Sequence, residues 1–155
     1  MVTMSFEVVP MCYEGYPAGE CAKRLIDAGA DIVGVNCLRN PEHTMPLVRQ
    51  MREAVSGFVA CQPTAYRTPP EKPDFTSLPE FPLGLDPLQL TREEMGRYAT
   101  QARDIGVNYI GSCCGSVAIH VREMARALGK IPLAEREWKS TTGKPMSAYE
   151  YYGHE

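Results

Sequence analysis

The sequence has no concentration of positive charge and no long apolar segment. Its formal net charge is −3 over 155 residues, and Lys and Arg form no run, so the electrostatic signature of binding to nucleic acid or to an anionic membrane is missing. No segment approaches the ~20 apolar residues that span a bilayer, and the first residues lack the basic start and apolar core of an export signal. We therefore expect no nucleic-acid partner, no membrane partner and a cytoplasmic location.

Several motifs for nucleotides, metals and redox chemistry are absent as well. No G-x-G-x-x-G or G-x-x-x-x-G-K-S/T stretch occurs at a strand-to-helix turn. The three histidines form no H-E-x-x-H pair, and no two cysteines have the C-x-x-C spacing. These absences disfavour a nucleotide-binding sheet, a histidine-based zinc site and a thioredoxin-like redox site.

The residues that are present alternate between strand and helix patterns. Strands are expected at 6–12, 31–36, 58–62 and 107–112, and helices at 18–28, 41–56, 92–105 and 116–128. Strand-helix units in series require a parallel sheet with right-handed crossovers. Two architectures satisfy this, a small open doubly wound sheet and half of an eight-stranded barrel, and the missing glycine motifs favour the half barrel. The predicted fold class is therefore α/β, of the (β/α)8 TIM-barrel type, with about four units present.

Two local signals mark where helices begin. Asn40 can cap a helix whose first residue is Pro41, because the Asn side chain accepts a free amide and Pro has no amide to leave unpaired. Thr91 and Glu94 have the capping-box spacing, in which each side chain binds the other residue's backbone amide. Helices are therefore expected to begin at residues 41 and 92.

The connection 64–90 has 27 residues and six prolines, which exclude a helix or a central strand. Apolar residues interleaved with the prolines predict packing rather than disorder: Phe75, Leu78, Phe81, Leu83 and Leu85. Loops of this length inside compact domains are often functional, so we expect an ordered cover over a site. The polar segment 130–155 is interpreted as a tail that follows one folded unit at 1–129.

Three cysteines stand where two of the expected strands end. Cys37 follows the second strand, and Cys113 and Cys114 follow the fourth. The carboxyl ends of parallel barrel strands share one face, so residues far apart in the sequence can converge there. Three thiolates suit a zinc ion and leave its fourth tetrahedral position open for water or substrate.

The vicinal pair poses a geometric condition. Consecutive strand residues point to opposite faces, so Cys113 and Cys114 can share one ion only if the strand ends before them. Gly111 and Gly115 flank the pair and offer the backbone freedom for a turn. We therefore predict a turn at this pair.

The remaining thiols and one amide carry further predictions. Because no export signal is seen, the six cysteines are expected to be reduced. Cys12 is an alternative ligand at the rim of the site, whereas Cys21 and Cys61 are expected in the core. Asn36, directly before Cys37, is expected to bind substrate or to orient a ligand, and the alternative is that it only satisfies loop amides.

Four segments together resemble the homocysteine S-methyltransferase family: Gly19-Glu-Cys21, Gly34-Val-Asn-Cys37, Leu78-Pro-Glu-Phe-Pro82 and Tyr109-Ile-Gly-Ser-Cys-Cys-Gly115. The similarity extends over about 6–128, and G-x-N-C and G-x-C-C-G are its specific motifs. The resemblance implies a barrel in which Cys37, Cys113 and Cys114 hold a catalytic Zn²⁺ that binds the thiol of homocysteine. It further implies methyl transfer from a cationic donor, such as betaine or a methylsulfonium, to give methionine.

By the same resemblance, the chain corresponds to the C-terminal half of the barrel. In the family the first half holds the amino-acid end of homocysteine, and no position here can inherit that role. Besides homocysteine and a methyl donor, a complementary half barrel or a second copy of the chain is therefore an expected partner. The alternative is a catalytically silent half barrel that serves as a zinc-binding assembly partner or is a remnant.

Overall fold

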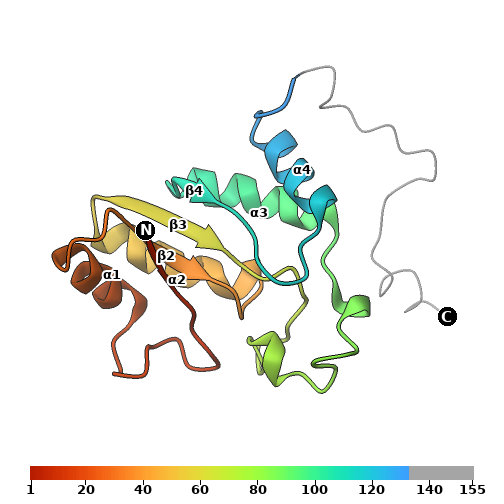
Figure 1. Ribbon diagram of the computed structural model, residues 1–155, viewed down its shortest axis with the longest axis horizontal. Coiled ribbons are helices and arrows are strands. Elements are labelled where there is room, and N and C mark those ends of the chain that lie inside the picture. Colours follow the sequence, from red (N-terminus) through yellow and green to blue (C-terminus); the bar gives the residue numbers. More distant parts are fainter. Residues whose placement is uncertain (133–155) are drawn as a thin grey trace.

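The computed structural model describes residues 1–132. Within them, four strands form one parallel sheet in the order β1-β2-β3-β4 and alternate with α-helices (Figure 1). The strands are β1 Val2–Met4, β2 Ile32–Asn36, β3 Phe58–Gln62 and β4 Tyr109–Ile110. The helices are α1 Ala18–Asp27, α2 Pro41–Ala54, α3 Arg92–Asp104 and α4 Ala118–Ala127. This confirms the α/β class with parallel strands, and the arrangement is consistent with part of a TIM barrel.

Helices α2 and α3 begin at the predicted residues, for the predicted reasons. The Asn40 side chain accepts the amide of His43 at 3.0 Å. At α3, Thr91 Oγ1 accepts the amide of Glu94 at 3.3 Å, and the Glu94 carboxylate accepts the amide of Thr91 at 2.7 Å. Each bond satisfies an amide that has no partner inside the helix.

The strand predicted at 6–12 is wrong, because the first strand is β1 and residues 6–12 are irregular. Their carbonyls are bound by the buried guanidinium of Arg39, which donates to Phe6 O and Val8 O at 2.9 Å each and to Glu7 O. Pro10 has no amide to offer a sheet. The backbone of this segment is therefore committed to a side chain instead of a neighbouring strand.

The fourth unit is shorter than predicted. β4 has two residues instead of the six expected at 107–112, and α4 begins at Ala118. His120 closes the start of α4, since its Nδ1 accepts the amide of Val117 at 3.2 Å and its Nε2 donates to Leu90 O at 2.8 Å. Burial lowers the pKa of His120, which matches a neutral ring with one acceptor and one donor nitrogen.

Helices α1, α2 and α3 cover one face of the sheet and α4 packs on α3. The core lies between the covering helices and alternate strand residues. Val33, Val35, Val59 and Cys61 are fully buried in this layer. Tyr98 of α3 is also inside it, and its hydroxyl lies 2.7 Å from the carbonyl oxygen of Cys61. This contact ties α3 to the middle of β3.

The opposite face of the sheet carries the other alternate residues. Phe58 and Tyr109 lie on it and are 59% and 47% exposed. In a complete barrel this face would be the packed interior. The exposure of these two aromatic rings is consistent with the sheet being part of a barrel.

The long connection is ordered, as predicted. It holds two short 3-10 helices, Phe75–Ser77 and Asp86–Leu88. Phe75, Leu78 and Leu85 are buried together against the turn after β2. Phe81 also packs, with its ring centroid 5.8 Å from that of Phe75, although it is 43% exposed. Leu83 was expected to pack as well, but it is 95% exposed.

No helix in residues 1–132 has the length and apolar character needed to traverse a bilayer. Most of the tail predicted at 130–155 lies outside the described residues, so the division at residue 129 stays a prediction.

Candidate metal centre

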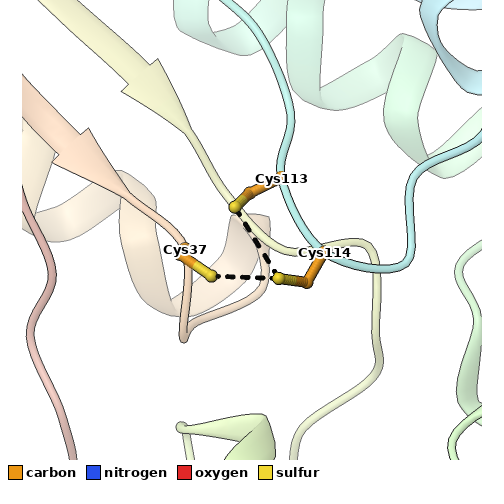
Figure 2. Close-up of side chains that lie close together, drawn as sticks. All are labelled: Cys37, Cys113 and Cys114. Carbon is orange, nitrogen blue, oxygen red and sulfur yellow. Dashed lines mark hydrogen bonds between the residues drawn. The ribbon is translucent and has the colours of Figure 1, made fainter.

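The sulfur atoms of Cys37, Cys113 and Cys114 lie together at the carboxyl end of the sheet (Figure 2). The Cys37 and Cys114 sulfurs are 3.4 Å apart, those of Cys113 and Cys114 are 3.8 Å apart, and all three fall within 4.8 Å of one another. Cys37 comes from the turn after β2, and the other two come from the segment between β4 and α4. The structure thus confirms the predicted convergence.

The spacing of the sulfurs fits a tetrahedral zinc site. A Zn–S bond of about 2.3 Å in tetrahedral geometry places two sulfurs about 3.8 Å apart. Two of the three observed separations are 3.4 and 3.8 Å. In residues 1–132 this is the only group of three or more Cys, His, Asp or Glu side chains positioned to share one ion.

The backbone at Cys37 turns sharply out of β2. Cys37 and Leu38 have φ values of +57° and +56°, a left-handed conformation that costs a non-glycine residue about 1–2 kcal/mol. The turn is held by the Cys37 amide, which donates to Gln62 O at 2.8 Å, and by the Arg39 amide, which donates to Cys37 O at 2.7 Å. Strain of this kind is typical of functional sites, where the surrounding structure imposes it.

The turn predicted at the vicinal pair is present. β4 ends at Ile110, and Gly115 has a φ of +77°. Gly111 has no positive φ, so its predicted conformational role is wrong. Its missing side chain instead permits a close approach, because a Cβ atom there would lie 3.0 Å from Gln62 Cγ.

The segment 62–66, which begins at the last residue of β3, lies between the two cysteine-bearing turns and binds both. Gln62 O accepts the Cys37 amide at 2.8 Å, and Pro63 O accepts the Cys113 amide at 2.9 Å. The site thus has a backbone support that contributes no sulfur. Nothing in the local sequence patterns identified this support, because its bonds join residues that are distant in the chain.

The same segment also holds the third cysteine. The carbonyl oxygen of Cys114 accepts the Ala65 amide and the Thr64 hydroxyl, each at 2.8 Å. Tyr66, which follows Ala65, places its ring close to Gly115. A Cβ atom added to Gly115 would be 2.8 Å from Tyr66 Cζ. The vicinal pair is therefore fixed from both sides.

The thiols favour their neutral forms when no cation is present. Burial, together with the contact to Cys37, raises the pKa of Cys113 to about 12. Burial and the Cys37 contact also raise the pKa of Cys114. A bound divalent cation has the opposite effect and stabilises thiolates.

The other cysteines lie outside this group. Cys21 and Cys61 are buried core residues, as predicted. Cys12 packs against the core and is not among the clustered ligand atoms. All six cysteines are free thiols.

Asn36 ends β2, where it is half-buried and pairs in register with Gln62 of β3. By strand alternation its side chain is on the uncovered face, next to the turn that carries Cys37. A role in binding substrate stays a prediction.

Comparison with known proteins shows which family this chain is similar to. The model of the homocysteine S-methyltransferase family matches residues 1–128. Betaine–homocysteine S-methyltransferase 1 of Danio rerio is 48% identical over 133 residues, which are 79% of this chain and 33% of that protein. The Mus musculus protein of the same name is 45% identical over 120 residues, 74% of this chain and 30% of that protein.

A relative with a different printed activity matches similarly. S-methylmethionine–homocysteine S-methyltransferase BHMT2 of Pongo abelii is 41% identical over 116 residues, which are 71% of this chain and 32% of that protein. The chain thus spans about a third of the length of these relatives. Since the family model covers nearly all of the described residues, this chain belongs to the homocysteine S-methyltransferase family.

Proposed function

We propose that the chain supplies the metal centre of an enzyme that methylates homocysteine to methionine. In this proposal Cys37, Cys113 and Cys114 hold one Zn²⁺, and the homocysteine sulfur takes the fourth position. The observation that carries the proposal is the group of three sulfurs that lie within 4.8 Å of one another in a member of this family. When bound, zinc would keep the substrate thiol as a thiolate at neutral pH, where a free thiol is mostly protonated.

The cysteines themselves would set the charge of the site. Three thiolates carry more negative charge than one divalent ion neutralises, so a fourth sulfur would be held weakly and stay nucleophilic. Cys114 is exposed, whereas Cys37 and Cys113 are half-buried. The approach of substrate is therefore proposed from the Cys114 side.

The methyl donor is proposed to be a cation. A new bond forms between the homocysteine sulfur and the methyl carbon, while the bond from that carbon to the donor nitrogen or sulfur breaks and leaves its electron pair on the donor. A positively charged donor atom becomes neutral in this step and leaves readily. Two relatives bear names with different donors, betaine and S-methylmethionine, and both donors carry the methyl on a cationic atom.

Aromatic rings near the sulfurs are candidates for holding such a cation. Tyr66 packs with Phe75 at 5.3 Å between ring centroids, and Phe75 packs with Phe81 at 5.8 Å. This aromatic row adjoins Cys37. Tyr109, in contrast, lies at the start of β4 on the uncovered face, so we favour Tyr66 and Phe81 over Tyr109.

The chain is proposed to form the C-terminal four units of the barrel. The parallel sheet with two unpaired edges, the exposed Phe58 and Tyr109, and a matched segment that is about a third of the relatives' length support part of a barrel. The choice of the C-terminal units rests on the resemblance of the cysteine motifs to those of the family. A complementary half barrel or a second copy of the chain would then cover the sheet. The covering part would supply the groups for the amino-acid end of homocysteine.

Zinc analysis of single cysteine variants tests the ligand set. The purified chain is expected to bind one zinc ion per copy, and Cys37→Ser, Cys113→Ser and Cys114→Ser are each expected to lose most of it. Cys12→Ser is the matched control, since Cys12 lies outside the sulfur group. Stoichiometric zinc in any of the three variants would reject this set.

Reconstitution tests the reaction and separates it from the silent alternative. The chain is mixed with the first half of a relative's barrel, and methionine formation is measured with betaine and with S-methylmethionine. Methionine formation that is lost in Cys114→Ser supports the enzyme. Full zinc binding with no turnover from any donor would favour a zinc-binding assembly partner, a reading that the open sheet edges also support.

A further inference from the structure

We propose that Thr64 is a positioning residue of the metal centre, and that its hydroxyl holds the backbone that carries Cys114. The inference rests on the proposed ligand set and extends it to a residue that supplies no ligand atom. Thr64 is fully buried. Its hydroxyl donates to the carbonyl oxygen of Cys114 at 2.8 Å.

Thr64 joins the two turns that bear the sulfurs. Its amide donates to Arg39 O at 2.9 Å, in the turn that carries Cys37, while its hydroxyl binds Cys114 in the other turn. One residue therefore connects both parts of the ligand set. Loss of the hydroxyl would leave the Cys114 carbonyl with the Ala65 amide alone and would give the Cys114 sulfur more freedom relative to the Cys37 sulfur, which lies 3.4 Å away.

The hydroxyl is the part of this support that depends on residue identity. Gln62, Pro63 and Ala65 use only backbone atoms, which almost any residue could provide at those positions. The Cys114 carbonyl has two lone pairs, and one of its two bonds comes from the Thr64 side chain. Replacement by Val keeps the shape of the side chain and removes the donor.

The position of Cys114 needs such a restraint. Among the three cysteines it is the exposed one, and it precedes Gly115 in a left-handed turn. An exposed ligand beside a glycine has more freedom to move than a ligand packed on a strand. Partners outside the ligand set typically change metal affinity by about 10–100-fold, and we expect the lower end because the bond is to the backbone and not to the sulfur.

The test is a zinc titration of the full chain against a competing chelator. Thr64→Val is expected to weaken zinc binding by about tenfold, and Thr64→Ser, which keeps the hydroxyl, is expected to bind nearly as the unaltered chain does. Thr100→Val is the control, because the Thr100 hydroxyl also donates to a backbone carbonyl, at 3.2 Å in α3, away from the sulfurs. Thr44 is unsuitable as a control, since it shares the Arg39 carbonyl with Thr64.

Cobalt substitution adds a readout that general destabilisation does not produce. The charge-transfer band of Co²⁺ reports the bound thiolates, and in Thr64→Val with saturating cobalt it is expected to shift or lose intensity because the Cys114 thiolate is less well positioned; a band identical to that of the unaltered chain would overturn the role of Thr64. In Thr64→Ser and Thr100→Val the band is expected to keep its intensity.

The outcomes separate this inference from the proposed function. If the unaltered chain bound no zinc, both would be overturned. If it bound zinc and Thr64→Val bound it equally well, or if Thr100→Val lost as much affinity, the role of Thr64 alone would be overturned. Should Thr64→Val fail to fold, Thr64→Ala is measured by the same criteria.

Discussion

Substitution of Gly115 by Ala is expected to damage both the stability of the protein and its metal centre. Gly115 directly follows Cys114 and has a φ of +77°. A Cβ atom added there would lie 2.8 to 2.9 Å from three carbon atoms of the Tyr66 ring. Real Cβ atoms do not approach carbon so closely, so either the ring or the backbone of the cysteine turn must move.

The magnitude has two parts. A left-handed conformation costs a residue with a side chain about 1–2 kcal/mol, and overpacking against a ring that is already in place costs about 1–3 kcal/mol more. Gly115→Ala should therefore lower the free energy of unfolding by about 2–5 kcal/mol. Gly29→Ala is a matched control, because Gly29 has a φ of +97° but no atom within 4 Å of the added Cβ, and it should lose only the first part.

Urea denaturation of Gly115→Ala and Gly29→Ala measures the difference between their free energies of unfolding. A zinc titration measures whether Gly115→Ala also weakens the metal centre. The double variant Gly115→Ala with Tyr66→Ala removes the ring that is struck, so the two substitutions should be non-additive, with the double variant more stable than the sum of the single effects predicts. Equal destabilisation of Gly29→Ala and Gly115→Ala, or strict additivity with Tyr66→Ala, would refute the packing argument.

Three further outcomes are expected. Gly34→Ala should prevent folding, because its Cβ would lie 2.2 Å from the backbone oxygen of Ala60, whereas Gly57→Ala, with no atom nearer than 3.4 Å, should fold; circular dichroism of both decides this. His120 has a lowered pKa in the folded protein, so its neutral form stabilises the fold above the usual histidine pKa of about 6.5, and this stabilisation is lost as the pH falls. The urea midpoint should therefore drop between about pH 7.5 and 5. An equal drop in His120→Gln would contradict the role of His120. Arg39→Met should cost about 2–4 kcal/mol by leaving backbone carbonyls unpaired and should speed proteolysis within 6–9; unchanged cleavage would count against the role of the guanidinium.

Elements with local signals were predictable from the sequence. The start of α2 follows from Asn40 and Pro41, and the start of α3 follows from the Thr91 and Glu94 pair, since caps act within one helical turn. β3 matches its predicted range because its apolar run is bounded by a glycine and a proline. In each case the neighbouring residues determine the outcome.

The first strand could not be predicted in the same way. Residues 6–12 have a stronger apolar pattern than β1, but the structure commits their carbonyls to Arg39, which is more than 30 positions away. A short stretch of sequence does not show that a distant side chain will bind its carbonyls in place of a neighbouring strand. Phe6 is buried all the same, so the apolar pattern indicated burial correctly and the type of structure wrongly.

The residues of the site likewise fall into those that the sequence predicted and those that it did not. Cys37, Cys113 and Cys114 were identified because strand ends in a parallel sheet converge, and this rule requires only the order of the elements. The supporting segment 62–66 was missed because its role lies in bonds to turns 25 and 50 residues away. Thr64 carries no chemistry that a sequence pattern would reveal.

The position of the supporting segment 62–66 predicts that zinc binding and methyl transfer depend on different parts of a barrel. All three sulfurs and the backbone that holds them come from the units between β2 and α4, so the geometry of the ion site is complete within the described residues. The uncovered face of the sheet carries Asn36 as a predicted substrate contact, and under the proposed function the groups for the amino-acid end of homocysteine come from a complementary half barrel. Zinc affinity should therefore change little when a complementary half barrel is added, whereas methyl transfer should depend on it. A large gain in zinc affinity on reconstitution would mean that the added half barrel also shapes the ion site, and that the 62–66 segment alone does not hold it.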